Sequence, residues 1–517
     1  MTAMSSTPTQ TPAAASSPRG GRLDNFFTIT GRGSSISREV RGGLVTFFTM
    51  AYIIALNPLI IGTAADKNGH LINGAPKFLD AAGTQLNDAA MTESKLMVAA
   101  ATALVAGILT ILMGVVGRFP LALATGLGLN AMLAFTLAPQ MTWPQAMGLV
   151  VWEGILITIL VLTGLREAIF RAVPSALRSA ISIGIGLFIT LVGLVSAGVI
   201  RRGVGTPLEL GVGGMLQGWP IAVCIFGFLL LVVLVVKKVP GAMLISIVVT
   251  SALAVVIELI VKVGPRLGPD SATGWSPNGP TLPKASDWVT PDLGLLGRVD
   301  LFGAFSPDGK FHLGYVLGLV LVVFALLLAD FFDTMGTVVA VGAEGNLLNE
   351  NGEPPHLREV LLVDSLGAIG GGLGSVSSNT SFVESTAGVA EGARTGLASV
   401  VTGLSFLAAI FLAPAVSMVP AEAAAPVLAF VGFLMMAQVT KVSWDDIEEG
   451  IPAFLTIVLM PFAYSITVGI GAGFIVFVLI KVLVGKAKQV HPLLWGVAAA
   501  FLIYFAQGIL LSLIDKI

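Results

Sequence analysis

Long apolar runs without charge recur along almost the whole chain, and this pattern constrains the fold more than any other feature. The stretch 313–329 contains no charged residue, and comparable runs precede and follow it. A helix of about 20 apolar residues crosses the hydrocarbon core of a bilayer. Only 11% of the residues are charged, against about 25% in soluble domains. We therefore predict an all-α polytopic membrane protein, since the short alternating strands of a membrane β-barrel are absent from the sequence.

The composition also excludes several function classes. A net charge of −2 gives no indication of nucleic-acid binding, and Cys224, the single cysteine, forms neither a disulfide framework nor a metal cluster. The four histidines fall in loops or at span ends, and the sequence contains no phosphate loop, nucleophile elbow or HExxH pattern. We predict neither an enzyme nor a bound cofactor or metal.

The apolar runs predict fourteen spans, seven on each side of a polar loop at 264–312. In the first half they cover 40–64, 95–116, 119–137, 143–165, 179–200, 219–236 and 240–262. In the second half they cover 313–337, 360–373, 379–391, 395–418, 423–439, 451–466 and 468–484. A further apolar segment, 492–513, is either a fifteenth span or a surface helix.

The two halves resemble each other, and two of their segments are interrupted. In both halves a span starts at a Val-Pro pair and another at a Trp-Pro or Ile-Pro pair. Because each half has seven spans, an odd number, the second half begins on the opposite side of the membrane, and the two repeats are inverted relative to each other. Glycines and an asparagine interrupt the segment 124–131, and its counterpart 374–381 is rich in glycine and serine. Irregular backbone at membrane depth must be buried in protein or line a cavity. In inverted-repeat transporters the binding site lies where such interrupted segments meet.

Two aspartates end the uncharged run at 313–329. Asp330 and Asp333 are spaced i, i+3 on neighbouring parts of one helix surface, and Thr334 lies one turn from Asp330. An aspartate at bilayer depth costs about 2.5–3.5 kcal/mol on insertion scales, so it generally faces a cavity or a partner. We predict that this segment binds a small polar substrate and the coupling proton.

The second interrupted segment supplies another carboxylate. The stretch 370–378 suits an extended crossing, after which Ser378 or Asn379 can cap a half-helix with Glu384 in its first turns. Asp330, Asp333 and Glu384 have no intramembrane Lys or Arg partner evident in the sequence. A buried carboxylate without such a partner tends to take a proton, as a proton symporter requires.

Other residues in the spans leave two interpretations open. A planar aromatic substrate could stack on Phe331 or its neighbour Phe332, and plain helix packing explains this pair equally well. Glu153 lies inside the fourth span, where we favour a structural hydrogen bond between helices over a direct role in the site.

Four motifs resemble those of the AzgA-like purine permeases, a family in the nucleobase–cation symporter and nucleobase–ascorbate transporter group. They are Ala-Asp-Phe-Phe-Asp-Thr-Met-Gly-Thr at 329–337, Asn-Thr-Ser-Phe-Val-Glu-Ser at 379–385, Thr-Met-Ala-Tyr-Ile-Ile-Ala-Leu-Asn-Pro at 49–58 and Gly-Leu-Gly-Leu-Asn-Ala at 126–131. The likeness covers about 38–484. It implies proton-coupled purine uptake by a homodimer with an elevator motion.

The resemblance also implies domains and residue roles. The core domain would comprise 38–165 and 313–418, and the gate domain 166–263 and 419–490. A disordered cytoplasmic tail (1–37), an extracytoplasmic loop (264–312) and a C-terminal helix (491–517) complete the chain. Asp330 and Glu384 match the two acidic positions that hold the base, Asp333 a second important aspartate and Asn130 a family asparagine. We expect Asn379 to support proton coupling together with Asp333.

A carboxylate on each of two facing helices could pair with purine N–H groups, while backbone groups at Asn130 and Val383 read the other edges. We therefore predict a purine nucleobase (adenine, guanine, hypoxanthine) and proton symporter in the cell inner membrane, multi-pass, with its N-terminus in the cytoplasm. Its partners would be the nucleobase, the proton, membrane lipid and a second copy of the chain. The alternatives are a uracil/xanthine-type or inorganic-anion carrier on the same fold, or a membrane enzyme or receptor.

Overall fold

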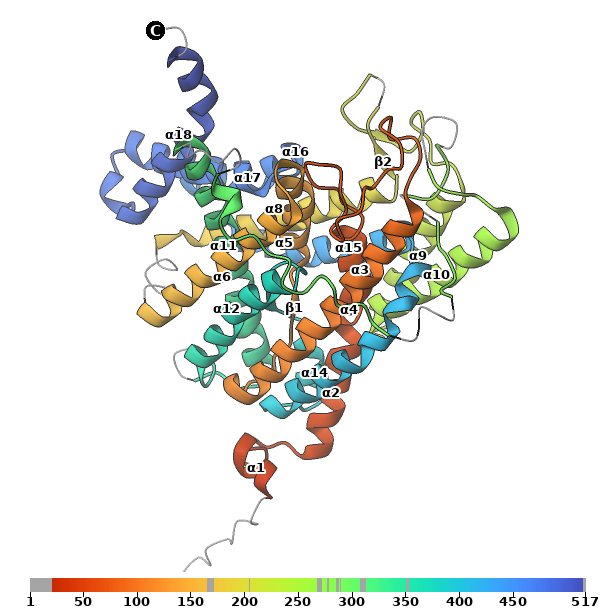
Figure 1. Cartoon of the computed structure of the whole chain (residues 1–517). Coiled ribbons are helices and arrows are strands. Elements are labelled where there is room, and N and C mark those ends of the chain that lie inside the picture. Colours follow the sequence, from red (N-terminus) through yellow and green to blue (C-terminus); the bar gives the residue numbers. More distant parts are fainter. Residues whose placement is uncertain are drawn as a thin grey trace, which may run out of the picture.

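The structure is a bundle of helices with two short strands near its centre (Figure 1). It is a computed structural model. It describes residues 21–164, 172–203, 205–266, 272–276, 279–284, 288, 290–306, 313–349 and 353–514. The sequence also predicts an amphipathic stretch on the cytoplasmic surface at 165–177, of which 165–171 lie outside the described residues.

Most helices follow the apolar runs of the sequence. The first half contains α1 (Arg22–Phe27), α2 (Ile36–Met50), α3 (Ile53–Ile60), α4 (Asp88–Leu112), α5 (Leu127–Met132), α6 (Trp143–Thr163), α8 (Ser175–Ser196), α9 (Trp219–Val236) and α10 (Ala242–Val261). The second half contains α11 (Leu313–Glu344), α12 (Leu357–Leu373), α13 (Ser385–Ala390), α14 (Gly396–Ala409), α15 (Ala421–Met436), α16 (Ile447–Phe462), α17 (Ile466–Leu483) and α18 (Pro492–Ile514). The exception is α1, which lies in the tail (1–37) predicted to be disordered and whose Phe27 packs with Ile29 and Leu397.

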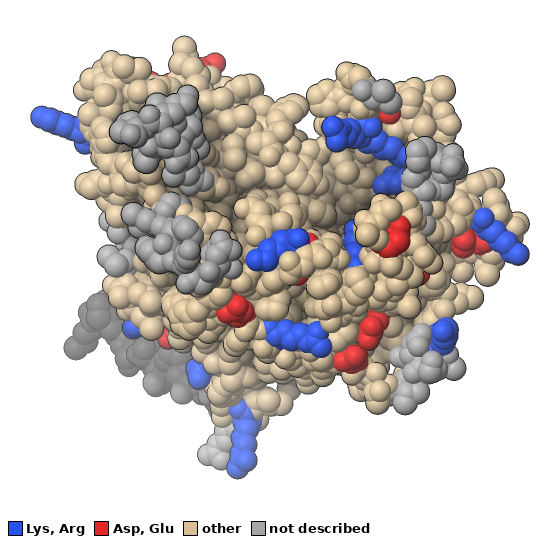
Figure 2. All heavy atoms as spheres, turned by 45° about the horizontal axis from the view of Figure 1, so that its top comes forward, with Lys and Arg blue, Asp and Glu red and all other residues tan. Residues whose placement is uncertain are grey.

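The polytopic helical fold is confirmed. Within the described residues, ten helical segments are long and apolar enough to cross a membrane. The helices α12 and α16 are shorter, at 17 and 16 residues. Figure 2 shows a face on which uncharged residues form most of the surface, while Lys, Arg, Asp and Glu side chains form separate patches, most of them in the lower and right-hand parts of the view.

Side-chain caps start several helices where the apolar runs begin. The side chain of Ser35 accepts a hydrogen bond from the backbone N–H of Arg38, and that of Asn87 accepts one from Ala90. The Ser465 side chain does the same for Val468. Such caps satisfy backbone donors that have no partner within the helix.

Two interrupted segments meet at the centre of the bundle. Strand β1 (Leu123–Thr125) pairs antiparallel with β4 (Asn379–Ser381), and the register places Leu123 opposite Ser381. A short helix follows each strand, α5 after β1 and α13 after β4. The expected meeting of two half-extended crossings is therefore present, although the inverted relation of the two halves stays a prediction.

The second crossing differs in detail from the prediction. Residues 370–373 belong to α12 and are helical. Asn379 lies in β4 and caps no helix, because α13 begins only at Ser385, with Glu384 at its N-cap position. The glycines that indicated a break instead allow close helix packing. A Cβ on Gly372 of α12 would come within 2.7 Å of Val151 Cγ2 of α6.

The helices pack in two groups with α11 between them. In one group α8 contacts α15 and α16, and α16 contacts α17. In the other, α14 contacts α2 and α4, and α6 contacts α12. Helix α11 touches α6 and α13 on one side and α8 and α17 on the other. This division resembles the predicted core and gate, whose exact bounds remain a prediction.

The apolar segment predicted at 492–513 forms α18. This helix packs on α17 and α11, and its C-terminal end points away from the bundle (Figure 1). Phe501 is fully buried beside Phe474, with ring centroids 6.4 Å apart.

Candidate functional site

A cavity of about 890 Å³ lies beside the β1–β4 crossing. Its walls come from Gly126–Leu129 at the start of α5, from Ser381–Glu384 between β4 and α13, and from α11. The opposite wall comes from α8, α15 and η9 (Ala437–Lys441). The cavity therefore lies between the two helix groups. Its volume falls in the range of about 300–1,000 Å³ that holds small-molecule ligands.

Two carboxylates line this cavity. Glu384 reaches it from the N-cap of α13, and Asp333 from α11. The hydroxyl of Tyr52, which also lines the cavity, donates a hydrogen bond of 2.5 Å to Oε1 of Glu384. This bond holds one Glu384 oxygen in a fixed position and leaves the other to face a ligand.

Tyr52 was not among the residues predicted for the site. It is only 1% exposed and lies in the break between α2 and α3. The sequence signal that could have identified it is its place in the Thr-Met-Ala-Tyr motif inside an apolar span. A tyrosine buried there needs a hydrogen-bond partner, which a nearby carboxylate can provide.

Asp330 lies behind the cavity and does not line it. The side chain is fully buried, and neither of its oxygens makes a well-aligned hydrogen bond to a described residue. The sequence placed Asp330 in the wall of the site and Asp333 in a supporting position. In the structure α11 directs Asp333 to the cavity and Asp330 toward α6 and α12. Their roles in purine binding remain predictions.

The other predicted site residues divide between the cavity and its support. Val383 lines the cavity and is 44% exposed. Phe331 is buried in the core, and Phe332, whose ring packs edge-on against it at 5.1 Å, lines the cavity instead. Thr334 is fully buried and donates a hydrogen bond to Asp364.

The two asparagines support the crossing from inside. Asn130 is fully buried and donates a hydrogen bond of 2.6 Å to the Thr125 hydroxyl of β1. Asn379, opposite Thr125 in the register, is also fully buried. Neither side chain lines the cavity, so the wall near them is formed by the backbone and side chains of Gly126–Leu129.

The wall on the other helix group carries cationic and amide side chains. Arg178 of α8 and Lys441 of η9 line the cavity, as does Gln438, which donates a hydrogen bond of 2.8 Å to Ser182. The sequence prediction placed no site residue on these elements. Neither the spacing nor the hydropathy of α8 and α15 distinguishes the face that meets α11.

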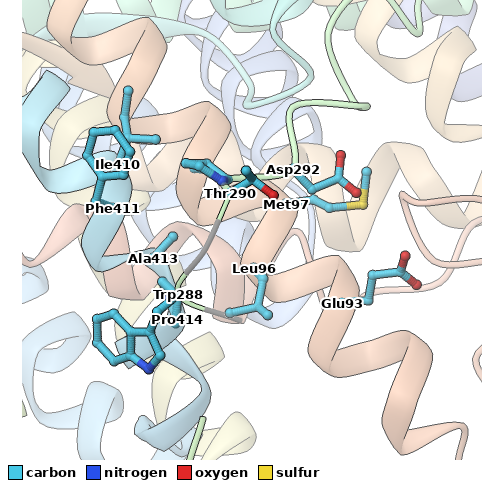
Figure 3. A pocket seen from close by; sticks show the side chains of 12 residues that line it. Glu93, Leu96, Met97, Trp288, Thr290, Asp292, Ile410, Phe411, Ala413 and Pro414 are labelled. Carbon is cyan, nitrogen blue, oxygen red and sulfur yellow. The ribbon is translucent and has the colours of Figure 1, made fainter. Parts of the chain in front are cut away.

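A second, smaller pocket of about 130 Å³ does not compete with this site (Figure 3). Its side chains come from α4, from Trp288, Thr290 and Asp292, and from η8 (Ile410–Met418). The volume lies below the range of typical ligand pockets.

The large cavity combines hydrogen-bonding and apolar groups. Its two carboxylates can accept hydrogen bonds, and apolar side chains such as Phe332 and Leu127 line other parts of the wall. Among the described residues, no group of three or more His, Cys, Asp or Glu side chains is arranged to hold a metal ion.

A bundle of membrane-length helices around a central cavity with two carboxylates in its wall is typical of a membrane transport protein. Residues 81–472 match the model of a permease family, and the chain belongs to that family. It is a transporter rather than an enzyme.

Relatives match along almost the full length. The chain is 36% identical over 487 residues to the guanine/hypoxanthine permease PbuG of Bacillus subtilis, covering 93% of this chain and 99% of the relative. It is 35% identical over 485 residues to the adenine permease AdeP of Escherichia coli, covering 93% and 96%. The nucleobase transporter PlAzg2 of Paenibacillus larvae is 33% identical over 448 residues, covering 86% and 77%. The resemblance to AzgA-like purine permeases is thereby confirmed.

Solved structures confirm the fold. The transmembrane domain of the cyanobacterial bicarbonate transporter BicA aligns with a TM-score of 0.54 at 15% identity, covering 84% of this chain and 96% of that one. Murine Slc26a9, an anion transporter, aligns with a TM-score of 0.55 at 11% identity, covering 92% and 74%.

Proposed function

We propose that the protein imports purine nucleobases, among them adenine, guanine and hypoxanthine, by proton symport across the cytoplasmic membrane. The observation that carries this proposal is the cavity beside the β1–β4 crossing, with Asp333 and Glu384 in its wall. Relatives named as guanine/hypoxanthine and adenine permeases support the substrate class.

The cavity chemistry suits a purine in particular. A purine presents N–H donors and ring-nitrogen acceptors in one plane, and Glu384 can accept such donors while Tyr52 fixes its orientation. The backbone beside Val383 and Gly126–Leu129 offers further groups for the remaining edge. A site of such polar groups rejects analogues that lack the matching donor.

An elevator motion would fit this position of the cavity. The carboxylates come from α11 and from the N-cap of α13, which pack on one helix group through α6 and α2, and α8, α15 and η9 of the other group close the opposite wall. We propose that the first group, as the core, carries the purine past the second, the gate, in a homodimer whose N-terminus is cytoplasmic.

Uptake of radiolabelled adenine, guanine and hypoxanthine into cells expressing the protein tests the proposal. We expect accumulation that a protonophore abolishes and that excess unlabelled purine competes away. Uracil and bicarbonate, which represent the two alternative carriers on this fold, should not compete. Absent purine uptake, or uptake indifferent to the protonophore, contradicts the proposal.

A further inference from the structure

Three carboxyl groups lie together behind the cavity, and the sequence prediction connected only one of them to the site. They are Asp330 of α11, Asp364 of α12 and Glu153 of α6, and each is at most 1% exposed. They are electrostatic neighbours: Asp364 acts on both other groups, and Glu153 also acts on Asp330.

Hydroxyl groups of threonine and serine contact this cluster. Asp364 Oδ1 accepts hydrogen bonds from Thr334 at 2.9 Å and Ser381 at 2.8 Å. Glu153 Oε1 accepts a longer one, 3.4 Å, from Ser378. The Thr380 hydroxyl lies near Asp330 but is engaged with Thr334 at 2.9 Å.

Several oxygens of the cluster lack a well-aligned hydrogen-bond partner. They are Oε2 of Glu153 and both oxygens of Asp330, judged among the described residues. The charged side chains that act on Asp330 are Asp364, Glu153 and Asp333, and Asp364 also acts on Glu153. Because several kcal/mol oppose each unpaired buried ion, burial favours a state in which Glu153 and Asp330 are not both charged.

A proton fits this cluster better than a metal ion. The described part of the chain contains no group of three acidic or histidine side chains close enough to ligate a metal. A proton shared between carboxyl groups removes charge and also provides an O–H donor for an unpaired oxygen.

One hydroxyl connects the cluster to the cavity. Ser381 lines the cavity wall next to Phe382 and Glu384, and the same side chain donates its hydrogen bond to Asp364. A proton entering from cavity water could bind the Ser381 oxygen while the hydroxyl hydrogen passes to Asp364 Oδ1. One O–H bond forms at serine as one breaks, and the net change is a single proton added to the cluster.

We propose that Asp364 and Glu153 hold the exchangeable proton of transport behind the purine site and that Ser381 connects them to the cavity. This inference rests on the proposed function and deepens it. It assigns to Glu153 more than the structural hydrogen bond that we expected from the sequence. Purine binding and protonation of the cluster would then favour each other, because linkage between two sites is reciprocal.

Calorimetry of the purified full chain tests the inference. Hypoxanthine is titrated in buffers of different ionisation enthalpy, so that the protons taken up per bound purine are measured directly. We expect proton uptake by the wild type and its loss in Glu153→Gln and Asp364→Asn, which keep the size of each side chain. The matched control is Glu422→Gln, another fully buried glutamate, in α15 and remote from the cavity lining. It should behave like the wild type.

The outcomes separate the two proposals. A wild type that binds no purine contradicts the proposed function, whereas Glu153→Gln and Asp364→Asn with unchanged proton uptake overturn only this inference. If those variants do not fold, Ser381→Ala decides, because it leaves all three carboxyl groups in place. Purine exchange and proton-driven accumulation are both measured in proteoliposomes, so that any loss of binding at this cavity-lining residue is corrected for. Accumulation relative to the variant's own exchange rate should fall at least tenfold, and an unchanged ratio overturns the inference.

Discussion

Asp330 and Asp333 lie three residues apart on α11 and have opposite surroundings. Asp333 is exposed to a cavity that can hold a ligand, and Asp330 is sealed among Asp364, Glu153 and threonine hydroxyls. A carboxylate in an open cavity can exchange water for the donors of a ligand. A sealed carboxylate without a cation must instead be neutralised. One helix turn thus separates a group suited to recognition from a group suited to holding a proton.

The largest effect should follow Glu384→Gln, which tests the recognition side of this comparison. The change replaces an acceptor for purine N–H groups by an amide and disturbs the Tyr52 bond. Hydrogen bonds to charged groups contribute about 1.5–3 kcal/mol, so we expect purine affinity to fall about 100-fold. Calorimetric titration measures it, with Glu391→Gln, at the exposed end of the same short helix, as the matched control. Wild-type affinity in Glu384→Gln contradicts the proposed site.

Gly154→Ala tests the α6–α12 packing that keeps Asp330 away from the cavity. The added methyl group would lie 2.6 Å from the Ile369 nitrogen of α12. Overpacking of this kind typically costs 1–3 kcal/mol, so we expect a loss of about 2 kcal/mol in the free energy of unfolding. Thermal unfolding in detergent should show a lower midpoint. Gly496→Ala in α18, where nothing lies within 4 Å, serves as the control and should leave the midpoint unchanged or raise it. Equal midpoints for both variants are evidence against close α6–α12 contact.

A comparison of Asp333→Asn with Asp330→Asn tests whether Asp333, rather than Asp330, faces the purine. Asp333 lines the cavity, so its substitution should weaken purine binding about tenfold, or by about 1.4 kcal/mol. The effect of Asp330→Asn on affinity at low pH should be smaller, because a neutral amide there resembles a protonated acid. Loss of binding in Asp330→Asn alone would restore the arrangement expected from the sequence.

Tyr52→Phe should have the smallest effect of these changes. It removes one hydrogen bond to Glu384 and leaves the ring in place. The net contribution of such a bond is about 1 kcal/mol, and we expect purine affinity to fall about fivefold. Competition binding with labelled hypoxanthine measures this change. An unaltered affinity indicates that Glu384 is oriented without the tyrosine.

The fold could be predicted in large part because hydropathy is a local property. Most apolar runs form helices, and the glycines and asparagine around Asn130 marked the first crossing correctly. The prediction of the second crossing was less accurate, because glycine also occurs where two backbone segments pack closely. Gly371 and Gly372 lie at such contacts with other backbone atoms.

The site could be predicted only in part because depth and direction depend on the neighbouring helices. Helix α11 is apolar around most of its surface, so the spacing of Asp330 and Asp333 does not indicate which one faces a cavity. Asp364 carried the same signal as Asp330, a lone carboxylate within an apolar span. Its connection to Ser381 and to Glu153 appears only when α12, β4 and α6 are placed together.

A structure of the protein with bound hypoxanthine tests the central claim most directly. We expect the purine beside the β1–β4 crossing, with its N–H edge within hydrogen-bond distance of Glu384 and Asp333 and with Asp330 behind them out of contact. A purine bound elsewhere, or one that touches neither Glu384 nor Asp333, would contradict the claim.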